Sequence, residues 1–258
     1  MTARDIISIL EEFAPAGIQE EWDNSGLMVG DISREIDSVL LALDCTPEVI
    51  EEAGERGVKM IVTHHPLIFK GVKSIGADNI LGRAIMSAIK KDIIIYSMHT
   101  NIDKVPGGVS SLMAGRLGLI NVQILESEDN GATGLGVIGD LEEEMSVRDF
   151  IKVVKESFSL NIIRSSKERV KKIKRVALCG GSGGSLINRA RLSGADVFIS
   201  GDISYHNYFC EDGFMVMDIG HYESEIDVLN LLMSVILKKI PNFAVHISEK
   251  NNNPIYYH

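Results

Sequence analysis

The sequence is poor in cysteine, in basic residues and in long apolar runs. Its three cysteines have no paired spacing such as Cys-x-x-Cys, so they fit reduced thiols rather than a disulfide framework. The net charge of −10, from 36 acidic and 26 basic residues, disfavours nucleic acid as a partner, because phosphate binding needs a basic surface. The longest apolar runs are far shorter than the roughly 20 residues of a membrane helix. Acidic residues near the start argue against a signal peptide, and we therefore expect a cytoplasmic protein.

The composition is that of a globular protein, and the sequence contains an internal repeat. Apolar residues make up 45% of the chain and charged residues 24%, as in an ordinary folded protein. The segment VLLALDCTPEVIEEAGERGVKMIVTHH, from Val39, aligns without a gap with VALCGGSGGSLINRARLSGADVFISGD, from Val176, at an offset of 137. Each segment has the pattern of a strand, a turn, an amphipathic helix and a second strand, and Gly57 and Gly194 coincide where the helix must stop. The pattern predicts two βαβ units with parallel strands.

Two further pairs of segments extend the repeat. TARDIISILEEF near the start resembles SVRDFIKVVKESF from Ser146, and IYSMHTNID resembles VMDIGHYESE. Chance explains three matches in the same order poorly. We therefore predict an α/β fold of two similar lobes, 1–125 and 126–258, that arose by an internal duplication.

Polar side chains collect where the predicted strands end. His64 and His65 follow MIVT, His99 and Asp103 follow IIIYSM, and His221 and Glu225 follow FMVMDIG. The functional groups of parallel α/β sheets gather beyond the carboxyl ends of the strands. A cleft between the lobes would bring all six side chains together, so we expect the site there.

Histidine and carboxylate together, with no cysteine at the matching positions, suit a divalent metal such as zinc, iron, manganese, cobalt or nickel. Six donors are too many for one tetrahedral ion with an open position, but they suit two ions about 3.5–4 Å apart with a bridging carboxylate. Neighbouring side chains on a continuing strand point to opposite faces, so His64 and His65 can share one site only if the strand ends at them and the backbone bends. If the two side chains diverge at the strand end, each can hold one ion of a pair. The alternatives are that the adjacent histidines are structural and that each His-x-x-x-acid pair is an ordinary helical pair. We expect His206, His246 and His258 to be surface or hydrogen-bonded core residues.

A glycine-rich turn, CGGSGGS at 179–185, joins a predicted strand to a predicted helix. It fits a tight turn without a ligand, and the alternative is an anion site with Ser182 and Gly183 as donors. Local spacing places no histidine partner near Cys179, which argues against a nucleophilic thiol.

The only tryptophan, Trp22, stands in the segment EEWDNSGLMVGD and is most simply a buried anchor. Asp23 and Asn24 are typical of a turn, and near the cleft either residue could orient a metal-binding histidine. The basic run KERVKKIKR at 167–175 is predicted to be solvated surface.

Taken together, these motifs resemble the NIF3-like family, whose members are also called dinuclear metal centre proteins and homologues of a type 2 GTP cyclohydrolase 1. The resemblance is carried by WDNSGLMVGD, VTHHPLIFKGVKSI, SMHTNIDKVPGGV, GDISYHNYFCEDG, DIGHYESE and NNNPIYY, and it covers essentially the whole chain. It implies a two-lobed α/β fold that binds two divalent metal ions between the lobes. The family's ligands map onto His64, His65, Asp103, His221 and Glu225, with Glu225 as the bridge. The resemblance also implies a homo-oligomer, a toroidal hexamer.

His99 matches a family motif without being one of those ligands, so we take it as the candidate catalytic residue. A sixth ligand, a residue that orients a ligand and a proton-transfer residue are its open roles. The resemblance implies a hydrolase of the GTP cyclohydrolase type, in which metal-activated water would attack C8 of guanine, open the ring and release formate. The expected partner is therefore a small molecule such as a nucleotide, rather than nucleic acid or a membrane. The alternatives are a non-catalytic, metal-stabilised ring that binds a protein or nucleic-acid partner, and a protein that handles metal ions.

Overall fold

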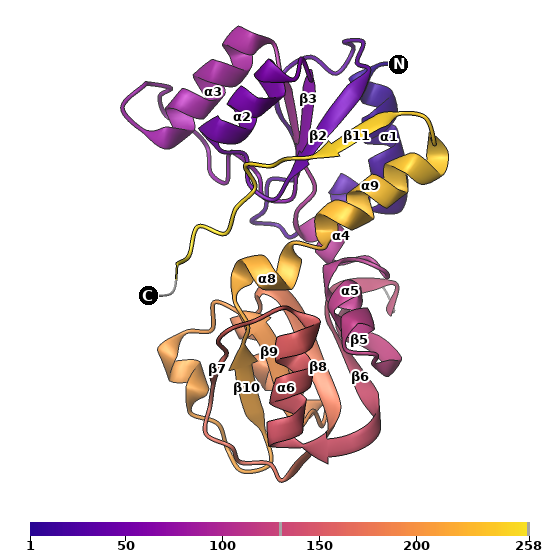
Figure 1. The fold of residues 1–258 in the computed structure, drawn as a ribbon, viewed down its shortest axis with the longest axis vertical. Coiled ribbons are helices and arrows are strands. Elements are labelled where there is room, and N and C mark those ends of the chain that lie inside the picture. The colour runs from indigo at the N-terminus through magenta and orange to yellow at the C-terminus, as the bar shows by residue number, and fades with distance from the viewer. Residues whose placement is uncertain (129–130, 257–258) are drawn as a thin grey trace. The chain divides into compact units, whose positions relative to one another are not determined.

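Two β-sheets, each packed against helices, make up the computed structural model, which describes residues 1–128 and 131–256 (Figure 1). The chain divides into two compact units. Unit 1 comprises Met1–Ile102 and Val228–His258, and unit 2 comprises Asp103–Asp227. The predicted α/β class is confirmed. Among the described residues, no helix is long and apolar enough to cross a bilayer.

Unit 1 is built on a five-stranded sheet in the order β1-β4-β3-β2-β11. Its strands are β1 (Gly26–Val29), β2 (Ser38–Ala42), β3 (Met60–Thr63), β4 (Ile94–Ser97) and β11 (Ala244–Ile247). Its helices are α1 (Ala3–Phe13), the 3-10 turn η1 (Ala16–Ile18), α2 (Pro47–Glu55), α3 (Ile80–Lys91) and α9 (Val228–Lys239), and the short α4 (Thr100–Asp103) ends at the boundary with unit 2. All neighbouring strands are parallel except β1, which pairs antiparallel with β4. The carboxyl ends of β2, β3 and β4 therefore meet at one edge of the sheet.

Helices cover both faces of this sheet, which explains why its inner strands are apolar on both sides (Figure 1). Leu40 and Ile61 pack with residues of α2 and α3, including Val49 and Ala84, in one buried cluster. On the other face, the hydroxyl of Tyr96 donates a 2.6 Å hydrogen bond to Oε1 of Glu11 on α1. Helices thus bury the strands from which the loops at the carboxyl edge extend.

Unit 2 is built on a six-stranded sheet in the order β5-β6-β8-β9-β10-β7. Its strands are β5 (Ile120–Glu128), β6 (Thr133–Ser146), β7 (Arg164–Ser165), β8 (Lys172–Ser182), β9 (Val197–Gly201) and β10 (Met215–Asp218). Its helices are α5 (Val109–Arg116), α6 (Val147–Ser157), α7 (Ile187–Leu192) and α8 (His221–Glu225), with the 3-10 turns η3 (Gly184–Leu186) and η4 (Tyr205–Tyr208). The three strands β8, β9 and β10 are parallel to one another, and the remaining pairs are antiparallel.

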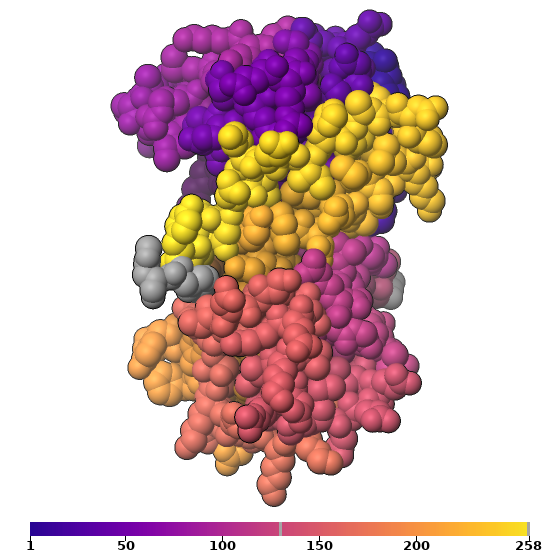
Figure 2. Space-filling model, viewed as in Figure 1, coloured from indigo at the N-terminus to yellow at the C-terminus, as the bar shows by residue number. Residues whose placement is uncertain are grey.

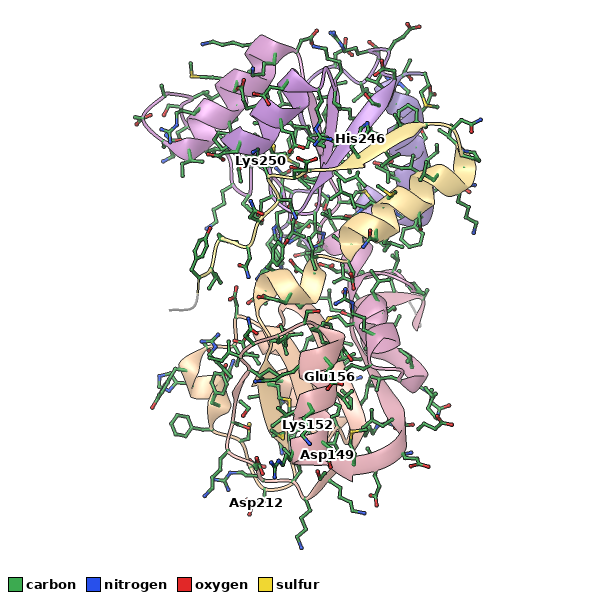
Figure 3. All side chains as sticks on the ribbon, viewed as in Figure 1. Asp149, Lys152, Glu156, Asp212, His246 and Lys250 are labelled. Carbon is green, nitrogen blue, oxygen red and sulfur yellow. The ribbon has the colours of Figure 1, made fainter. Side chains whose placement is uncertain are left out.

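Successive side chains of β8 point to opposite faces of the sheet and pack into two different cores of unit 2. Leu178 faces the cluster that contains Phe150 of α6, whereas Ala177 faces the cluster that contains Ala190 of α7. The opposite face of α6 carries charged side chains, of which Asp149, Lys152 and Glu156 are labelled in Figure 3. The helix α6 therefore buries one face and exposes the other.

The two βαβ units have the same register. Leu40 pairs with Ile61 in unit 1, and Ala177 pairs with Phe198 in unit 2, which are equivalent pairs at the predicted offset of 137. The helices of the two βαβ units, α2 and α7, also end in the same way, and each is followed by a glycine in the left-handed conformation (Gly57, φ 71°, and Gly194, φ 77°). In both cases the following amide donates to a carbonyl five residues back, as in a Schellman cap. The predicted βαβ units and their parallel strands are therefore present.

The chain returns to unit 1 at its C-terminal end, so the boundary differs from the predicted one between residues 125 and 126. The strand β5 runs across that position and pairs with β6, which keeps it in unit 2. The strand β11 pairs with β2, with His246 opposite Leu40, and its atoms lie against those of the first hundred residues in Figure 2. Beyond β11, the buried carboxylate of Glu52 accepts hydrogen bonds from the hydroxyl of Ser248 and from the amide of Glu249. Pairing between distant segments, not local composition, decides where the units begin.

Candidate metal centre

His64 and His65 stand where β3 ends and the backbone bends. Their consecutive amides both donate to carbonyls of the β2 segment, those of Ala42 and Leu43, at 3.2 and 2.9 Å. In a regular strand successive amides point in opposite directions, so this pattern marks the end of the strand. The two imidazole rings lie 4.9 Å apart between centroids, and His64 is fully buried. The two histidines are therefore neighbours on one side of the chain, as the sequence allowed only for a strand that stops here.

His99 follows β4 and joins the same group. Its ring centroid lies 5.3 Å from that of His64 and 5.5 Å from that of His65. One nitrogen of each of the three rings lies within 4.8 Å of the others. We call His64, His65 and His99 the histidine cluster of unit 1. The ends of β3 and β4 thus bring together three of the six side chains that were expected to share one site.

Each ring of the histidine cluster is oriented through Nδ1 by an oxygen acceptor. The acceptor is the carbonyl oxygen of Met98 for His64 (2.8 Å), a carboxylate oxygen of Asp44 for His65 (2.9 Å) and a carboxylate oxygen of Asp23 for His99 (2.7 Å). A proton held on Nδ1 leaves the lone pair of the neutral ring on Nε2. All three rings thus have the tautomer that a metal-binding histidine needs.

The segment around Trp22 is partly as expected and partly not. Asp23 orients His99, as proposed for this position, and it also accepts a 3.0 Å hydrogen bond from the amide of Thr100. Burial opposes ionisation of Asp23, but the hydrogen bonds from His99 and Thr100 outweigh it and hold the pKa of Asp23 below its ordinary value. The expectation that Trp22 is a buried anchor is wrong, because its side chain is 64% exposed. Its ring stands at the side of the His99 ring instead.

His221 and Glu225 begin and end the short helix α8 of unit 2. The i,i+4 spacing brings His221 Nε2 to 3.0 Å from Glu225 Oε2. Nδ1 of His221 donates to Oδ2 of Asp202 at 2.8 Å, so this ring has the same orientation as the three in unit 1. Glu225 is only 3% exposed, so its carboxylate is buried beside the His221 ring.

The glycine-rich turn packs against these residues, and two of its amides already donate to serine hydroxyls. The amide of Gly181 donates to the hydroxyl of Ser224 at 2.9 Å, and that of Gly183 donates to the hydroxyl of Ser200 at 2.8 Å. The proposed donor role of Gly183 toward a phosphate is therefore wrong, since a serine already uses that hydrogen. A Cβ at Gly181 would overlap Oε1 of Glu225, so the glycine makes room for the carboxylate.

Cys179 and Asp103 complete the surroundings of Glu225 in unit 2. Burial, with the nearby negative charges of Asp103 and Glu225, raises the pKa of the Cys179 thiol. A thiol that stays protonated is a poor nucleophile, in agreement with the expectation for this cysteine. Asp103 is the last residue of α4, and its charge contributes to the same local field as Glu225.

The remaining predictions about single residues concern the surface. His206 and His246 are exposed, and Figure 3 labels His246 on β11. His258 and Tyr257, which ends the motif NNNPIYY, lie outside the described residues. In the basic run 167–175, Lys172 pairs with Glu144, and Arg169 pairs with Asp212. These pairs agree with a solvated surface.

Sequence reasoning missed Asp44 and Asp202, which hold His65 and His221. Asp44 comes two residues after β2 ends, and Asp202 comes directly after β9, so both stand at carboxyl ends of parallel strands. Asp202 is also the counterpart of His65 at the offset of 137. A search for carboxylates at every strand end of the repeat would have found both.

The residues present fit a divalent metal by the chemistry of their donors. Unit 1 offers three imidazoles and unit 2 offers an imidazole and two carboxylates, the donor types that zinc, iron, manganese, cobalt and nickel accept. All four imidazoles have Nδ1 bonded to an oxygen, the arrangement that is usual around a metal-binding histidine.

Comparisons with known proteins agree along the whole chain. The model of the Duf34/NIF3 (NGG1p interacting factor 3) family matches residues 1–254. A protein of Clostridium perfringens named "GTP cyclohydrolase 1 type 2 homolog" is 42% identical over 97% of this chain and 97% of its own. Among solved structures, a hypothetical protein of Staphylococcus aureus has a TM-score of 0.91 at 33% identity, covering 100% of this chain and 99% of its own. A Bacillus cereus protein related to NIF3 has a TM-score of 0.89 at 26% identity with the same coverage. This chain belongs to the Duf34/NIF3 family.

Proposed function

We propose that this protein is a metal-dependent hydrolase that binds two divalent ions per chain. The observation that carries the proposal is the histidine cluster of unit 1, in which three imidazole nitrogens lie within 4.8 Å of one another and every Nδ1 is bonded to an oxygen. The proposed ligands are His64, His65, Asp103, His221 and Glu225. Glu225 is the proposed bridging ligand.

In the proposed mechanism, a bound divalent ion supplies Lewis acidity, which polarises a substrate and activates water near neutral pH. The protein's own residues supply orientation and proton transfer. Asp44 and Asp202 hold His65 and His221 in one tautomer, so that Nε2 keeps its lone pair. Asp23 does the same for His99, which can then accept a proton at Nε2 from water and pass it to a leaving nitrogen.

The name shared by the curated relatives supports a purine nucleotide as the substrate. Relatives such as the one from Clostridium perfringens are named as homologues of GTP cyclohydrolase 1 type 2. In a reaction of that type, one water opens the imidazole ring at C8, and a second water releases C8 as formate from the formamide that results. His99 is the proposed proton-transfer residue for both cleavages.

Elemental analysis and a substitution at Glu225 test the proposal. Purified protein should contain close to two equivalents of divalent metal, and Glu225→Gln should lower metal affinity at least about tenfold and abolish turnover of GTP. The matched control is Glu223→Gln on the same helix, which should keep both properties. Circular dichroism should show that both variants are folded. Full turnover by metal-free protein would refute the proposal.

A second function, binding of a partner by a metal-stabilised homo-oligomer, is favoured by one exposed surface. The side chains of Tyr205 and Phe209, in and just after η4, are each 73% exposed and contact one another at 5.6 Å between ring centroids. The family description also names an interacting factor. Light scattering of the wild type and of Tyr205→Ser with Phe209→Ser tests this role, since loss of a wild-type oligomer would support an interface there. A monomeric wild type would contradict it.

A further inference from the structure

Two aromatic side chains stand exposed beside the histidine cluster of unit 1. Trp22 is 64% exposed and Phe69 is 48% exposed. The centroid of the Trp22 ring lies 6.0 Å from that of His99, at an interplanar angle of 76°. The centroid of the Phe69 ring lies 5.6 Å from that of His99, at 90°. Both aromatic rings therefore contact the side of one imidazole.

These rings are held in place by their chain neighbours. Asp23, next to Trp22, bonds to Nδ1 of His99, and Asn24 donates through Nδ2 to the carbonyl of Ile68 at 2.6 Å. Ile68 precedes Phe69. The two segments that carry the rings are thus tied to each other and to His99. The backbone next to both rings is therefore ordered before a ligand binds, which lowers the entropy lost on binding.

The exposure of these rings needs a physical reason. A large apolar side chain left in water forgoes the stabilisation of burial, and ligand sites combine aromatic side chains with a few polar groups, as Trp22 and Phe69 do with His99. An aromatic ring offers a flat, polarisable face to which any nucleobase can stack.

The loop that carries Phe69 also carries positive charge. Lys70 and Lys73 follow on the same exposed stretch, one and four residues after the ring. In a chain with a net charge of −10, two lysines next to an aromatic ring favour an anionic ligand locally. A planar base joined to phosphate groups satisfies both features.

We propose that Trp22 and Phe69 bind the base of a nucleotide next to His99, with Lys70 and Lys73 facing its phosphates. The inference deepens the proposed function and relies on it only for the chemistry that follows binding. It assigns substrate recognition to residues that are not among the proposed metal ligands.

Trp22 makes the test specific, because it is the only tryptophan in the chain. Its fluorescence is followed while the full-length protein, with and without a chelator, is titrated with GTP, guanosine or inorganic triphosphate. A solution of N-acetyltryptophanamide corrects for light absorbed by the base. Guanosine and GTP should quench saturably, whereas triphosphate should not. GTP should bind more tightly than guanosine, and that advantage should fall with added salt and with Lys70→Gln and Lys73→Gln together.

Substitutions at Phe69 separate stacking from bulk. Phe69→Leu keeps an apolar side chain but removes the ring, and it should weaken binding at least about fivefold, the lower limit for loss of one stacked base. Phe69→Tyr keeps the ring and should keep the affinity. Phe209→Leu, at a phenylalanine of unit 2 that is 73% exposed, is the control and should bind nucleotide as the wild type does.

Three results would overturn the inference. The first is quenching of Trp22 by triphosphate alone, and the second is equal nucleotide affinity in Phe69→Leu and Phe69→Tyr. The third is Trp22 fluorescence that changes with protein concentration and not with nucleotide. The last result would identify the rings as a self-association surface. Saturable quenching without hydrolysis would refute the proposed function and support this binding site. Hydrolysis of GTP with an unchanged KM in Phe69→Leu would support the proposed function and refute this binding site.

Discussion

Gly181→Ala tests how closely the glycine-rich turn approaches Glu225. Gly181 has a φ of 61°, and a Cβ there would lie well inside 3.0 Å of Glu225 Oε1 and 3.1 Å from its carboxylate carbon. Normal contact distances therefore require the carboxylate to move by about 1 Å. Metal–oxygen distances tolerate deviations of only about 0.2 Å, so this movement should remove Glu225 as a ligand.

Two separable effects are expected from Gly181→Ala. Alanine in a left-handed conformation should cost about 1–2 kcal/mol of folding stability. Displacement of Glu225 should also lower metal affinity at least about tenfold. Because bound metal stabilises the folded state by mass action, the variant should gain less stability from added metal than the wild type does.

Gly194→Ala is the matched control, since it shares the backbone strain without the contact. Gly194 has a φ of 77° in the same unit, and a Cβ there would meet nothing within 4 Å. Both variants are compared by denaturant unfolding with metal and with chelator, and by elemental analysis after dialysis. Both should lose similar stability in chelator, but only Gly181→Ala should lose metal.

A full complement of metal in Gly181→Ala would refute the reasoning, because Glu225 would then be dispensable or able to adjust. Equal loss of metal in both variants would refute it in another way. Backbone strain in unit 2, and not the position of the carboxylate, would then control metal binding.

Two further predictions concern side chains that hold others in place. Asp202 has a φ of 50°, so Asp202→Gly should fold without added backbone strain. The variant removes the acceptor that orients His221, and it should weaken metal binding about 10- to 100-fold in a chelator competition. Metal affinity equal to that of the wild type would contradict the role of Asp202. Burial opposes ionisation of Glu52, but the hydrogen bonds from Ser248 and from the amide of Glu249 lower its pKa below the ordinary 4.5. The stabilisation of the C-terminal segment should therefore be complete above that value and be lost as the pH falls through the lowered pKa. Hydrogen exchange at residues 248–250, corrected for intrinsic rates, measures this loss. Glu52→Gln should show weak protection at every pH, and an unchanged profile in that variant would contradict the assignment.

The fold was predictable from the sequence where short-range patterns decide it. The apolar runs around Val39 and Val176 and the glycines that end the two helices specify a βαβ unit, and both units have the predicted register. Such features depend on residues a few positions apart, whose geometry follows from backbone sterics and helix capping. The histidines were found for a similar reason, because each lies within three residues of the end of a strand.

The surroundings of the histidines depend on long-range contacts that no local pattern specifies. Asp23 reaches His99 across 76 residues, and Asp44 reaches His65 across 21. The pairing of β11 with β2 places the C-terminal segment in unit 1. Trp22 is exposed, whereas the simplest expectation for a lone tryptophan was burial. Apolar side chains and strand edges can be satisfied by several partners, and the choice among them is a property of the whole packed chain. The tertiary structure therefore decided the order of the strands, the tautomers of the histidines and the exposure of Trp22. The sequence alone determined the βαβ units and the residue types that suit a metal ion.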